Sequence, residues 1–563
     1  MRPDTRTSRS VTGRRTIAAL SASAEPFGEE PVVPAPPGGG DTGRGIARNT
    51  AIFSVLTGLS RVIGLLREVI FASYFGTTQY ASAFAIAYQV PNYIAQLFAQ
   101  SALSAAFVPV FTELLQKGHR NAAIRLASTL FWMMLIGLGA ITALFILGAG
   151  VVMPLFIGPK FGQDLVGLTA GLSRVLFPVV LLLGLNGLLV GVLQSYDHFT
   201  IPALSPAVWN IVIIVLLVVL APHFHGEDEI YAFAIGILVA TGVQLSMAFA
   251  ALGRIDFRLR VHIDWRDPRV RQVFVLMLPV MLGLGIVNLD QLINATFGSL
   301  VSTEAPSAIN NAFRIYMLPQ GVFSVAVATV LFPTLSRMAS RRDPGAIRRT
   351  VGSGMRQINL LMIPAAAFML VLPTPIVRLV FERGAFNAQS THLVSIALFW
   401  FALSLPFGGL NLLLTRTFFA VQRPWIPTSL AAMNIVVDII VSIALYKPLG
   451  IAGLIIGTLT ANVIMTVLQF YRLRAGLNGR LEGAQTTMIT VRILIASVLL
   501  AGVSWVVWKL LDELLGTSLP AEIVSVGGAA AAGLAVYVRA VLVMRIPEAH
   551  QVSALIRARL GRA

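Results

Sequence analysis

Three arginines lie in segments that are apolar enough to cross a lipid bilayer. Arg61 and Arg67 fall in an apolar stretch over about 49–73, and Arg314 lies in another over about 307–335. A guanidinium at membrane depth is costly unless it faces a counter-ion or a water-filled cavity. Guanidinium groups also stay charged at any pH and bind phosphate oxygens two at a time. These positions therefore indicate the handling of an anion, and a diphosphate would suit them.

A carboxylate accompanies the first two arginines. Glu68 follows Arg67 directly and lies seven residues after Arg61. That spacing places Arg61 and Glu68 on one helix face, with Arg67 turned about 100° away. Two interpretations stay open: the arginines line a cavity, or they tie helices together through Glu68 and extend toward the membrane surface. In the first interpretation the binding site has four members: Arg61, Arg67, Glu68 and Arg314.

A second set of polar residues lies in two later apolar segments. Asn434 and Asp438 are four residues apart, and Asp290 and Asn294 share that spacing. Residues at this spacing stack on one helix face. Buried carboxylate and amide oxygens are suited to a sodium ion or a proton. Hydrogen bonding between helices is the alternative.

The composition identifies the compartment in which these residues work. Of the 563 residues, 56% are hydrophobic and 12% are charged, and the mean hydropathy is +0.80. Apolar segments of about 20 residues recur along the chain, which predicts an all-α integral membrane protein with about 14 transmembrane helices. Cysteine is absent, which excludes disulfides and thiolate metal sites. The net charge of +17 lies in short loops and tails, so membrane topology explains it better than nucleic-acid binding.

Loop charges set the expected orientation. Clusters of basic residues recur in every second loop, over about 117–125, 254–269, 337–349 and 472–480. Because cytoplasmic loops carry an excess of Lys and Arg, we expect both termini in the cytoplasm. The basic stretch Arg378–Arg383 is an exception on the predicted outer side.

An internal repeat sets the expected domain organisation. The interval from Asn210 to Asn434, which lie in similar surroundings, equals the interval from Pro109 to Pro333. We expect two parallel six-helix lobes, with substrate bound between them and access alternating as they rock. The chain is predicted to begin with a disordered basic cytoplasmic tail (1–48), followed by an N-terminal lobe (49–253) and a C-terminal lobe (254–474). A pair of further transmembrane helices (475–545) and a cytoplasmic tail (546–563) follow.

Signals of catalysis are poor. The sequence contains no phosphate-binding Walker loop, no His-Glu-x-x-His motif and no cysteine nucleophile. A transporter is therefore favoured over an enzyme.

Several motifs resemble a known family. They are Ser60-Arg61-Val62-Ile63-Gly64, Arg67-Glu68, Pro91-Asn92, Ala312-Phe313-Arg314 and Arg383-Gly384-Ala385-Phe386. Together they are similar to the MurJ (MviN) lipid II flippases of the multidrug/oligosaccharidyl-lipid/polysaccharide exporter superfamily. The resemblance implies a protein of the bacterial inner membrane, and we expect it to be a monomer. It also implies that lipid II, the lipid-linked peptidoglycan precursor, moves from the inner to the outer leaflet by alternating access, among membrane lipids.

The resemblance also implies roles for particular residues. Family arginines matching Arg61, Arg67 and Arg314 line a cationic central cavity that would meet the diphosphate. Some members bind sodium through their seventh, eleventh and twelfth spans. The matching positions here are Asp290 or Asn294, then Asn434 and Asp438, and Thr458.

The chain departs from the family in its second span. Positions where family members often carry charged residues are occupied here by Ser82, Ala95, Gln96 and Gln100. The lost charges leave the lipid cargo open, so export of another polyprenyl-linked lipid or a drug is an alternative. A non-transporting membrane scaffold is another. Sodium, a proton and the membrane potential all remain candidates for the driving force.

Overall fold

We describe the fold from a computed structural model. It describes the backbone of residues 40–98, 101–196, 198–255, 257–341, 343–477 and 482–550. Side chains are described for the same residues except 40–55, 57, 98, 101–105, 279–280 and 282–288. Residues Met1–Ile52 and Phe53–Ala563 form separate units, and the arrangement below concerns the second. Most of the predicted N-terminal tail and residues 551–563 of the C-terminal tail lie outside the described residues. The first helix begins at Gly40, before the predicted boundary.

All the elements in the described residues are helices, and their order recurs. The first repeat comprises α1 (Gly40–Phe75), α2 (Gln79–Phe98), α3 (Ser101–Gln116), α4 (Arg120–Val152), the short η2 (Met153–Phe156), α5 (Gln163–Leu176), α6 (Pro178–Ser195), α7 (Thr200–Leu220), η3 (Ala221–His223), η4 (Gly226–Glu229) and α8 (Ile230–Gly253). The second comprises α9 (Pro268–Val301), α10 (Ala305–Pro319), the π-turn η5 (Gln320–Ser324), α11 (Val325–Ser340), α12 (Pro344–Val371), α13 (Pro373–Phe381), α14 (Ala388–Ala420), α15 (Trp425–Leu449) and α16 (Ile451–Gly476). Outside the repeat lie α17 (Gly483–Leu515) and α18 (Leu519–Val543).

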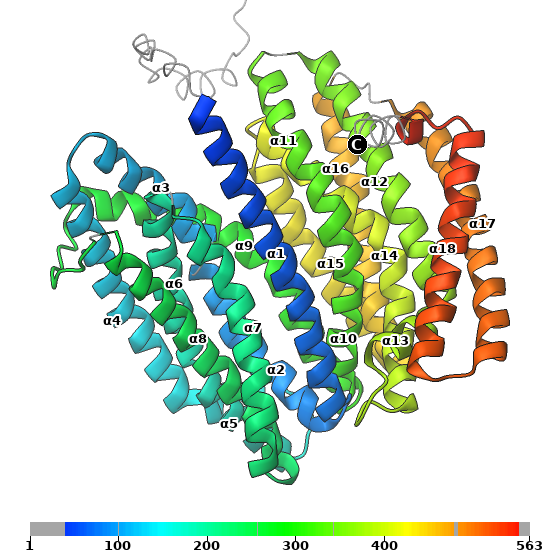
Figure 1. Cartoon of the computed structure of the whole chain (residues 1–563), viewed down its shortest axis with the longest axis horizontal. Coiled ribbons are helices and arrows are strands. Elements are labelled where there is room, and N and C mark those ends of the chain that lie inside the picture. The colour runs from blue at the N-terminus through cyan, green and yellow to red at the C-terminus, as the bar shows by residue number, and fades with distance from the viewer. Residues whose placement is uncertain are drawn as a thin grey trace, which may run out of the picture. The chain divides into compact units, whose positions relative to one another are not determined.

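The expected fold class, an all-α membrane protein, is confirmed. Within the described residues, eleven helices or joined helix pairs are long and apolar enough to cross a membrane. With α1, the α2–α3 pair and α9, they are consistent with the expected 14 crossings. Figure 1 shows these helices running side by side from Phe53 onward.

Three of the 14 expected spans are interrupted: the second, expected over about 81–115, the fourth, over about 165–193, and the eighth, over about 307–335. The second is divided into α2 and α3, at residues that lie outside the description. The fourth ends as α5 at Leu176 and restarts as α6 at Pro178, because proline has no N–H to continue the ladder but suits the first turn of a helix. The eighth contains a π-turn directly after Pro319.

The helices surround two hydrophobic cores. One is built from α2–α8 and the other mainly from α10–α16. The seventh predicted span, α9, lies at the seam, since it packs against α2 and α3 of the first repeat and against α15 of the second. Its Val273 and Leu292 join the first core although the chain order places them in the second repeat.

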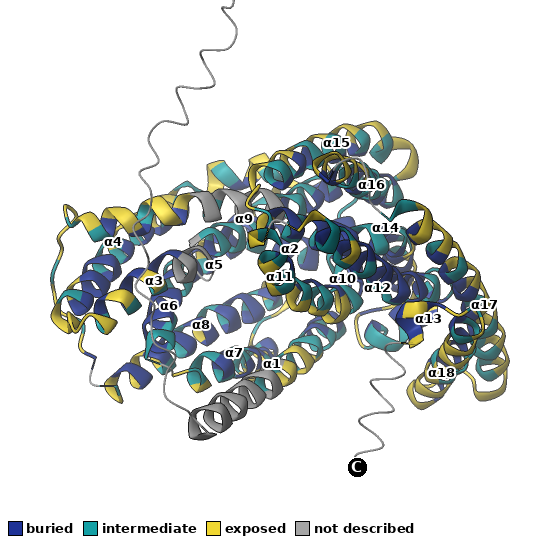
Figure 2. Ribbon diagram, turned by 90° about the horizontal axis from the view of Figure 1, so that it is seen from above, coloured by how far each residue is buried: buried dark blue, intermediate teal, exposed yellow. Residues whose placement is uncertain are grey.

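The outward faces of several helices are apolar. Figure 2 shows exposed residues along the outward sides of α4, α17 and α18. They include Leu147 and Val151 of α4, Val498 of α17 and Leu534 of α18. A stripe of this kind contacts acyl chains in a membrane-spanning bundle, as the sequence predicts.

The basic stretch Arg378–Arg383, which lies on the predicted outer side, has a local explanation. Arg378 lies in α13 and pairs with Asp512 at 2.7 Å and with Glu522, at the facing ends of α17 and α18. Arg383 donates to the carbonyls of Val380 and Leu379 at the end of α13. Cations at a helix C-terminus are stabilised there. These arginines therefore have structural partners, so they do not contradict the predicted orientation.

Candidate functional site

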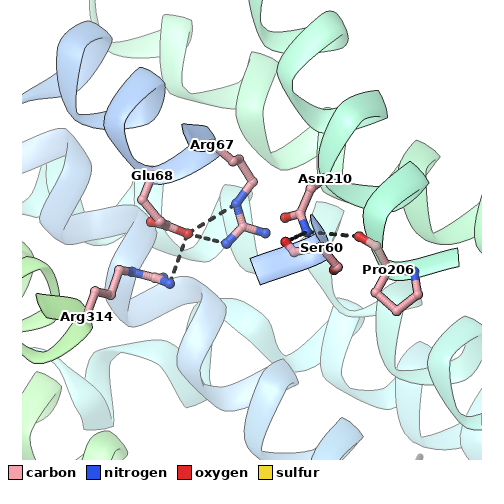
Figure 3. Close-up of polar contacts among 6 residues, drawn as sticks. All are labelled: Ser60, Arg67, Glu68, Pro206, Asn210 and Arg314. Carbon is pink, nitrogen blue, oxygen red and sulfur yellow. Dashed lines mark hydrogen bonds and ion pairs between the residues drawn. The ribbon is translucent and has the colours of Figure 1, made fainter. Parts of the chain in front are cut away.

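A charged cluster joins α1 of the first repeat to α10 of the second (Figure 3). Glu68 of α1 is only 6% exposed. Its Oε1 accepts from Arg314 Nη1 of α10 at 2.9 Å. The same oxygen accepts from Arg67 Nε at 3.1 Å and also contacts Arg67 Nη2. One carboxylate thus holds two guanidiniums, and the cluster keeps one net positive charge.

The neighbouring helix α7 positions the α1 side of this cluster. The Arg67 guanidinium lies 4.8 Å from the centre of the Trp209 ring, a cation–π contact. Asn210 donates to the carbonyls of Pro206 at 2.9 Å and Ser60 at 3.5 Å. Gly64 lies beside Asn210, where a Cβ would make an ordinary van der Waals contact with the amide nitrogen at 3.5 Å. The sequence indicates Asn210 as a marker of the repeat but does not indicate its neighbour Trp209 as a partner of Arg67.

Arg61 lies apart from this cluster. Its side chain is exposed, and its Nη1 donates to the carbonyl of Gly321 at 3.2 Å. Gly321 belongs to the π-turn η5, where the helical bonding pattern changes. Arg61 and Glu68 both contact the second repeat, as their shared helix face predicts. The structure does not bring Arg61 into the group formed by Arg67, Glu68 and Arg314.

The predicted cation-site residues largely converge. Asp438 of α15 is fully buried, and its Oδ1 accepts from Thr458 Oγ1 of α16 at 3.4 Å. Thr458 Oγ1 in turn accepts from Asn294 Nδ2 of α9 at 3.3 Å. The Asp290 carboxyl of α9 lies close enough to the Asp438 carboxyl for the two groups to interact electrostatically. Asp438 is fully buried and Asp290 is half-buried, so two negative charges here would lie close together with little water between them.

Two further residues, Ser442 and Gly457, lie against Asp438. Ser442, one turn after Asp438, donates to Asp438 Oδ1 at 3.1 Å and was not predicted, although its spacing of four could have indicated it. Gly457 lets α16 approach, since a Cβ there would lie 2.6 Å from Asp438 Oδ1. Asn434, by contrast, shows no bond to the group: its Nδ2 is buried without a hydrogen-bond partner among the described residues.

A small cavity adjoins the carboxylate pair. It measures about 30 Å³ and lies where α2, α9 and α10 meet. Asp290, Asn294 and Gln89 are among its lining residues. This volume is enough for about one water molecule or a small ion. Asp290 therefore borders a small cavity with polar lining residues, where α9 meets α2 of the first repeat.

One of the four second-span positions at which the sequence lacks the family's charges, Ser82, lies at the contact between the two repeats. Ser82 is fully buried, and its Oγ accepts from the backbone N–H of Ser307 at 3.2 Å, which links α2 to α10. Ala95 is buried and Gln96 is half-buried. Gln100 lies outside the described residues.

These observations define a class of protein. The fold is that of a membrane transporter built from two helical repeats, with charged groups where the repeats meet. Two solved structures share it: one of a lipid II flippase MurJ in an inward closed conformation (TM-score 0.73, 22% identity, covering 88% of this chain and 98% of that one), and one of an inward-facing multidrug resistance MATE family transporter of the MOP superfamily (TM-score 0.63, 16% identity, covering 75% and 94%).

Sequence comparison identifies the family. The model of the family described as lipid II flippase MurJ matches residues 71–524. A probable lipid II flippase MurJ of Rhizobium meliloti is 28% identical over 85% of this chain and 90% of its own length. The corresponding protein of Rhizobium tropici is 30% identical over 73% and 78%, and a lipid II flippase MurJ of Burkholderia cenocepacia is 29% identical over 75% and 82%. The chain belongs to the MurJ lipid II flippase family and is a multi-pass inner-membrane protein.

Proposed function

We propose that this protein flips lipid II from the inner to the outer leaflet, and that the diphosphate of the lipid displaces Glu68 from Arg67 and Arg314. The observation that carries this proposal is that one carboxylate holds two guanidiniums from opposite repeats. A diphosphate offers the same guanidiniums more charge and more acceptor oxygens than a carboxylate does. The ion-paired cluster would then serve both as a binding site and as a tie between helices.

Displacement of Glu68 would couple binding to movement. While Glu68 bridges Arg67 and Arg314, it ties α1 to α10. A diphosphate bound by both arginines frees that carboxylate, so the tie is replaced by the cargo. The repeats can then rearrange around the bound headgroup, as in other two-repeat transporters. Arg61 is exposed beside the π-turn, and it would meet a further anionic group of the same lipid.

The direct test is genetic complementation. Cells depleted of their own lipid II flippase should survive when they express this protein. A failure to support growth, with the protein present in the membrane at normal levels, would count against lipid II as cargo. Superfamily members that export other lipids or drugs would give this result, which makes the test informative about the substrate class.

The orientation of the chain follows from its loop charges. We propose that both termini and the basic loops after α3, α8, α11 and α16 face the cytoplasm. A reporter that is active only in the cytoplasm should work when fused after Val543. The same reporter inserted between α17 and α18 should be silent. Activity at the α17–α18 site and silence after Val543 would reverse the assigned topology.

A cation or proton at the Asp290–Asp438 pair would reset the cycle. We expect sodium, added at fixed pH and ionic strength, to raise the Tm of the purified protein, because a ligand at 100 times its Kd stabilises the folded state by about 2.7 kcal/mol. Asp438→Asn should remove this response and slow flipping. Asp164→Asn, which changes an exposed carboxylate at the start of α5, is the matched control.

Two results would change this assignment. A Tm that ignores sodium but flipping that depends on Asp438 would indicate a proton instead. A Tm that ignores sodium and normal flipping by Asp438→Asn would reduce these residues to hydrogen-bonding groups between α9, α15 and α16.

A further inference from the structure

The end of α1 docks on a loop of the other repeat. The backbone N–H of Ala385, between α13 and α14, donates to the carbonyl of Ser73 at 2.8 Å. The adjacent Gly384 has φ +58°, and a Cβ on it would lie 2.3 Å from the same carbonyl oxygen. Only a glycine allows this approach without movement of the backbone. Nearby, Thr77 Oγ1 donates to Ser390 Oγ at 2.8 Å in a buried contact.

The end of α9 docks in the same way on a loop of the first repeat. The backbone N–H of Gly158, between η2 and α5, donates to Ser299 Oγ at 2.7 Å. A Cβ on Gly158 would lie 2.7 Å from the Ser299 carbonyl oxygen. Lys160 Nζ also donates to the carbonyl of Val301, the last residue of α9. Glycine again permits the contact.

These two contacts share the approach of a glycine to a serine carbonyl, although their hydrogen bonds differ. Ala385 N–H donates to a backbone carbonyl, whereas Gly158 N–H donates to a serine hydroxyl. The interval in the chain from Ser73 to Ser299 equals the interval from Gly158 to Gly384, so the repeat relates both pairs. Each serine lies two residues before the end of the first helix of its repeat, α1 or α9. Each glycine lies in the loop that precedes α5 or α14, and it belongs to the opposite repeat from the serine it meets.

Both contacts lie on the same side of the bundle. The loops 76–78, 157–162, 302–304 and 382–387 alternate along the chain with the basic loops, so they lie at the opposite ends of the helices. Figure 1 shows the end of α1 beside α13 at the lower edge of the view. The repeats are therefore joined twice on this side, through backbone approaches that tolerate little displacement.

We propose that these contacts, Ser73 with Gly384–Ala385 and Ser299 with Gly158, are a pair of latches that hold the outer side closed and open together. The coupling follows from geometry: each latch joins the same two repeats, so a rocking movement that separates the outer ends must break both. This proposal rests on the proposed alternating-access function, and it assigns the outer gate to these backbone contacts rather than to the charged cluster.

One latch can be broken and the other observed. The chain contains no cysteine, so Thr77→Cys provides a single reporter at the first latch, where Thr77 is only 4% exposed. In that background Gly158→Ala should break the second latch by steric conflict. We expect labelling of the introduced thiol by a membrane-impermeant maleimide from outside to become about tenfold faster, which corresponds to about 1.4 kcal/mol in the opening equilibrium. Gly162→Ala, in the same loop with open space around it, should leave the rate unchanged.

The Gly384 side has its own matched control. Gly384→Ala should also accelerate labelling of the reporter, through its conflict with the Ser73 carbonyl. Gly516→Ala tests the effect of backbone strain alone, because Gly516 has φ +75° and nothing within 4 Å of its Cβ position. Equal labelling in the Gly384 and Gly516 variants would count against a latch at Gly384. Equal labelling in the Gly158 and Gly162 variants would overturn the coupling.

A reversible lock gives the converse test and avoids damaging substitutions. Thr77→Cys with Ser390→Cys replaces two hydroxyls that lie 2.8 Å apart and point toward each other, so the two thiols should meet and oxidise to a disulfide. Oxidation should stop flipping and slow hydrogen exchange at the Gly158 amide, in the other latch, and reduction should reverse both effects. The Thr77→Cys single variant under the same oxidant is the control.

The outcomes separate this proposal from the proposed function. Labelling and hydrogen exchange need no cargo. If the latches are coupled but the protein fails to complement, lipid II is refuted as the cargo, whereas the latch proposal stands. Unchanged exchange at Gly158 in the oxidised double variant would refute the latches, even if the protein supports growth.

Discussion

Arg314→Ala is expected to abolish lipid II flipping while leaving the protein folded in the membrane. The substitution removes one of the two guanidiniums that converge on Glu68, and the truncation of such a charged partner costs about 2–5 kcal/mol of binding. That corresponds to a loss of at least about thirtyfold in affinity. Glu68 keeps its contacts with Arg67, so no buried carboxylate is left unpaired and stability should change little. Complementation and the amount of protein in the membrane are the two measurements.

Matched variants sharpen this expectation. Arg67→Ala should behave like Arg314→Ala, with an additional loss of the Trp209 contact. Arg314→Lys keeps the charge but loses the planar fork, so we expect partial function. Arg539→Ala, on an exposed face of α18 outside the repeat, should complement fully. Full complementation by Arg61→Ala, Arg67→Ala and Arg314→Ala alike would eliminate the cationic cavity as the binding site.

Arg356→Ala is expected to destabilise the protein by about 3–5 kcal/mol, through a mechanism unrelated to cargo. Arg356 of α12 is 6% exposed and lies between two carboxylates from distant parts of the chain. Its Nη1 pairs with Glu482 at 2.9 Å, before α17, and its Nε pairs with Glu548, beyond α18. Removal of the arginine leaves the buried Glu548 without this counter-ion. The measurement is the Tm of the purified protein.

A charge-matched variant tests the assigned cause. Arg356→Met combined with Glu482→Gln and Glu548→Gln removes all three charges together, so it should recover most of the lost Tm. If the triple variant is as unstable as Arg356→Ala, the arginine acts through packing rather than through its charge. Neither variant should change the cargo preference of whatever protein remains folded, since the cluster lies away from Arg67 and Arg314.

The sequence determined those features that depend on local composition and spacing. Apolar length predicted the crossing helices, because every backbone polar group in a bilayer must be satisfied within its own helix. The fold class and the family were confirmed. The cost of a buried guanidinium indicated Arg67 and Arg314. A spacing of four predicted the stacked pairs Asp290 with Asn294 and Asn434 with Asp438 on their helices.

Only the tertiary structure decided which of these residues meet. Glu68 and Arg314 belong to different repeats and lie far apart in the chain, so their pairing depends on how α1 sits against α10. The same holds for the hydrogen bond of Thr458 with Asp438 and for the partners of Arg378. It also holds for Arg61, which bonds outside its expected group, and for Asn434, whose amide nitrogen has no hydrogen-bond partner among the described residues. Hydropathy and helical periodicity act within one helix, whereas these contacts depend on the register between helices. That register is set by close approaches such as Gly158 to Ser299 and Gly384 to Ser73, and a sequence shows such a glycine without showing what it faces.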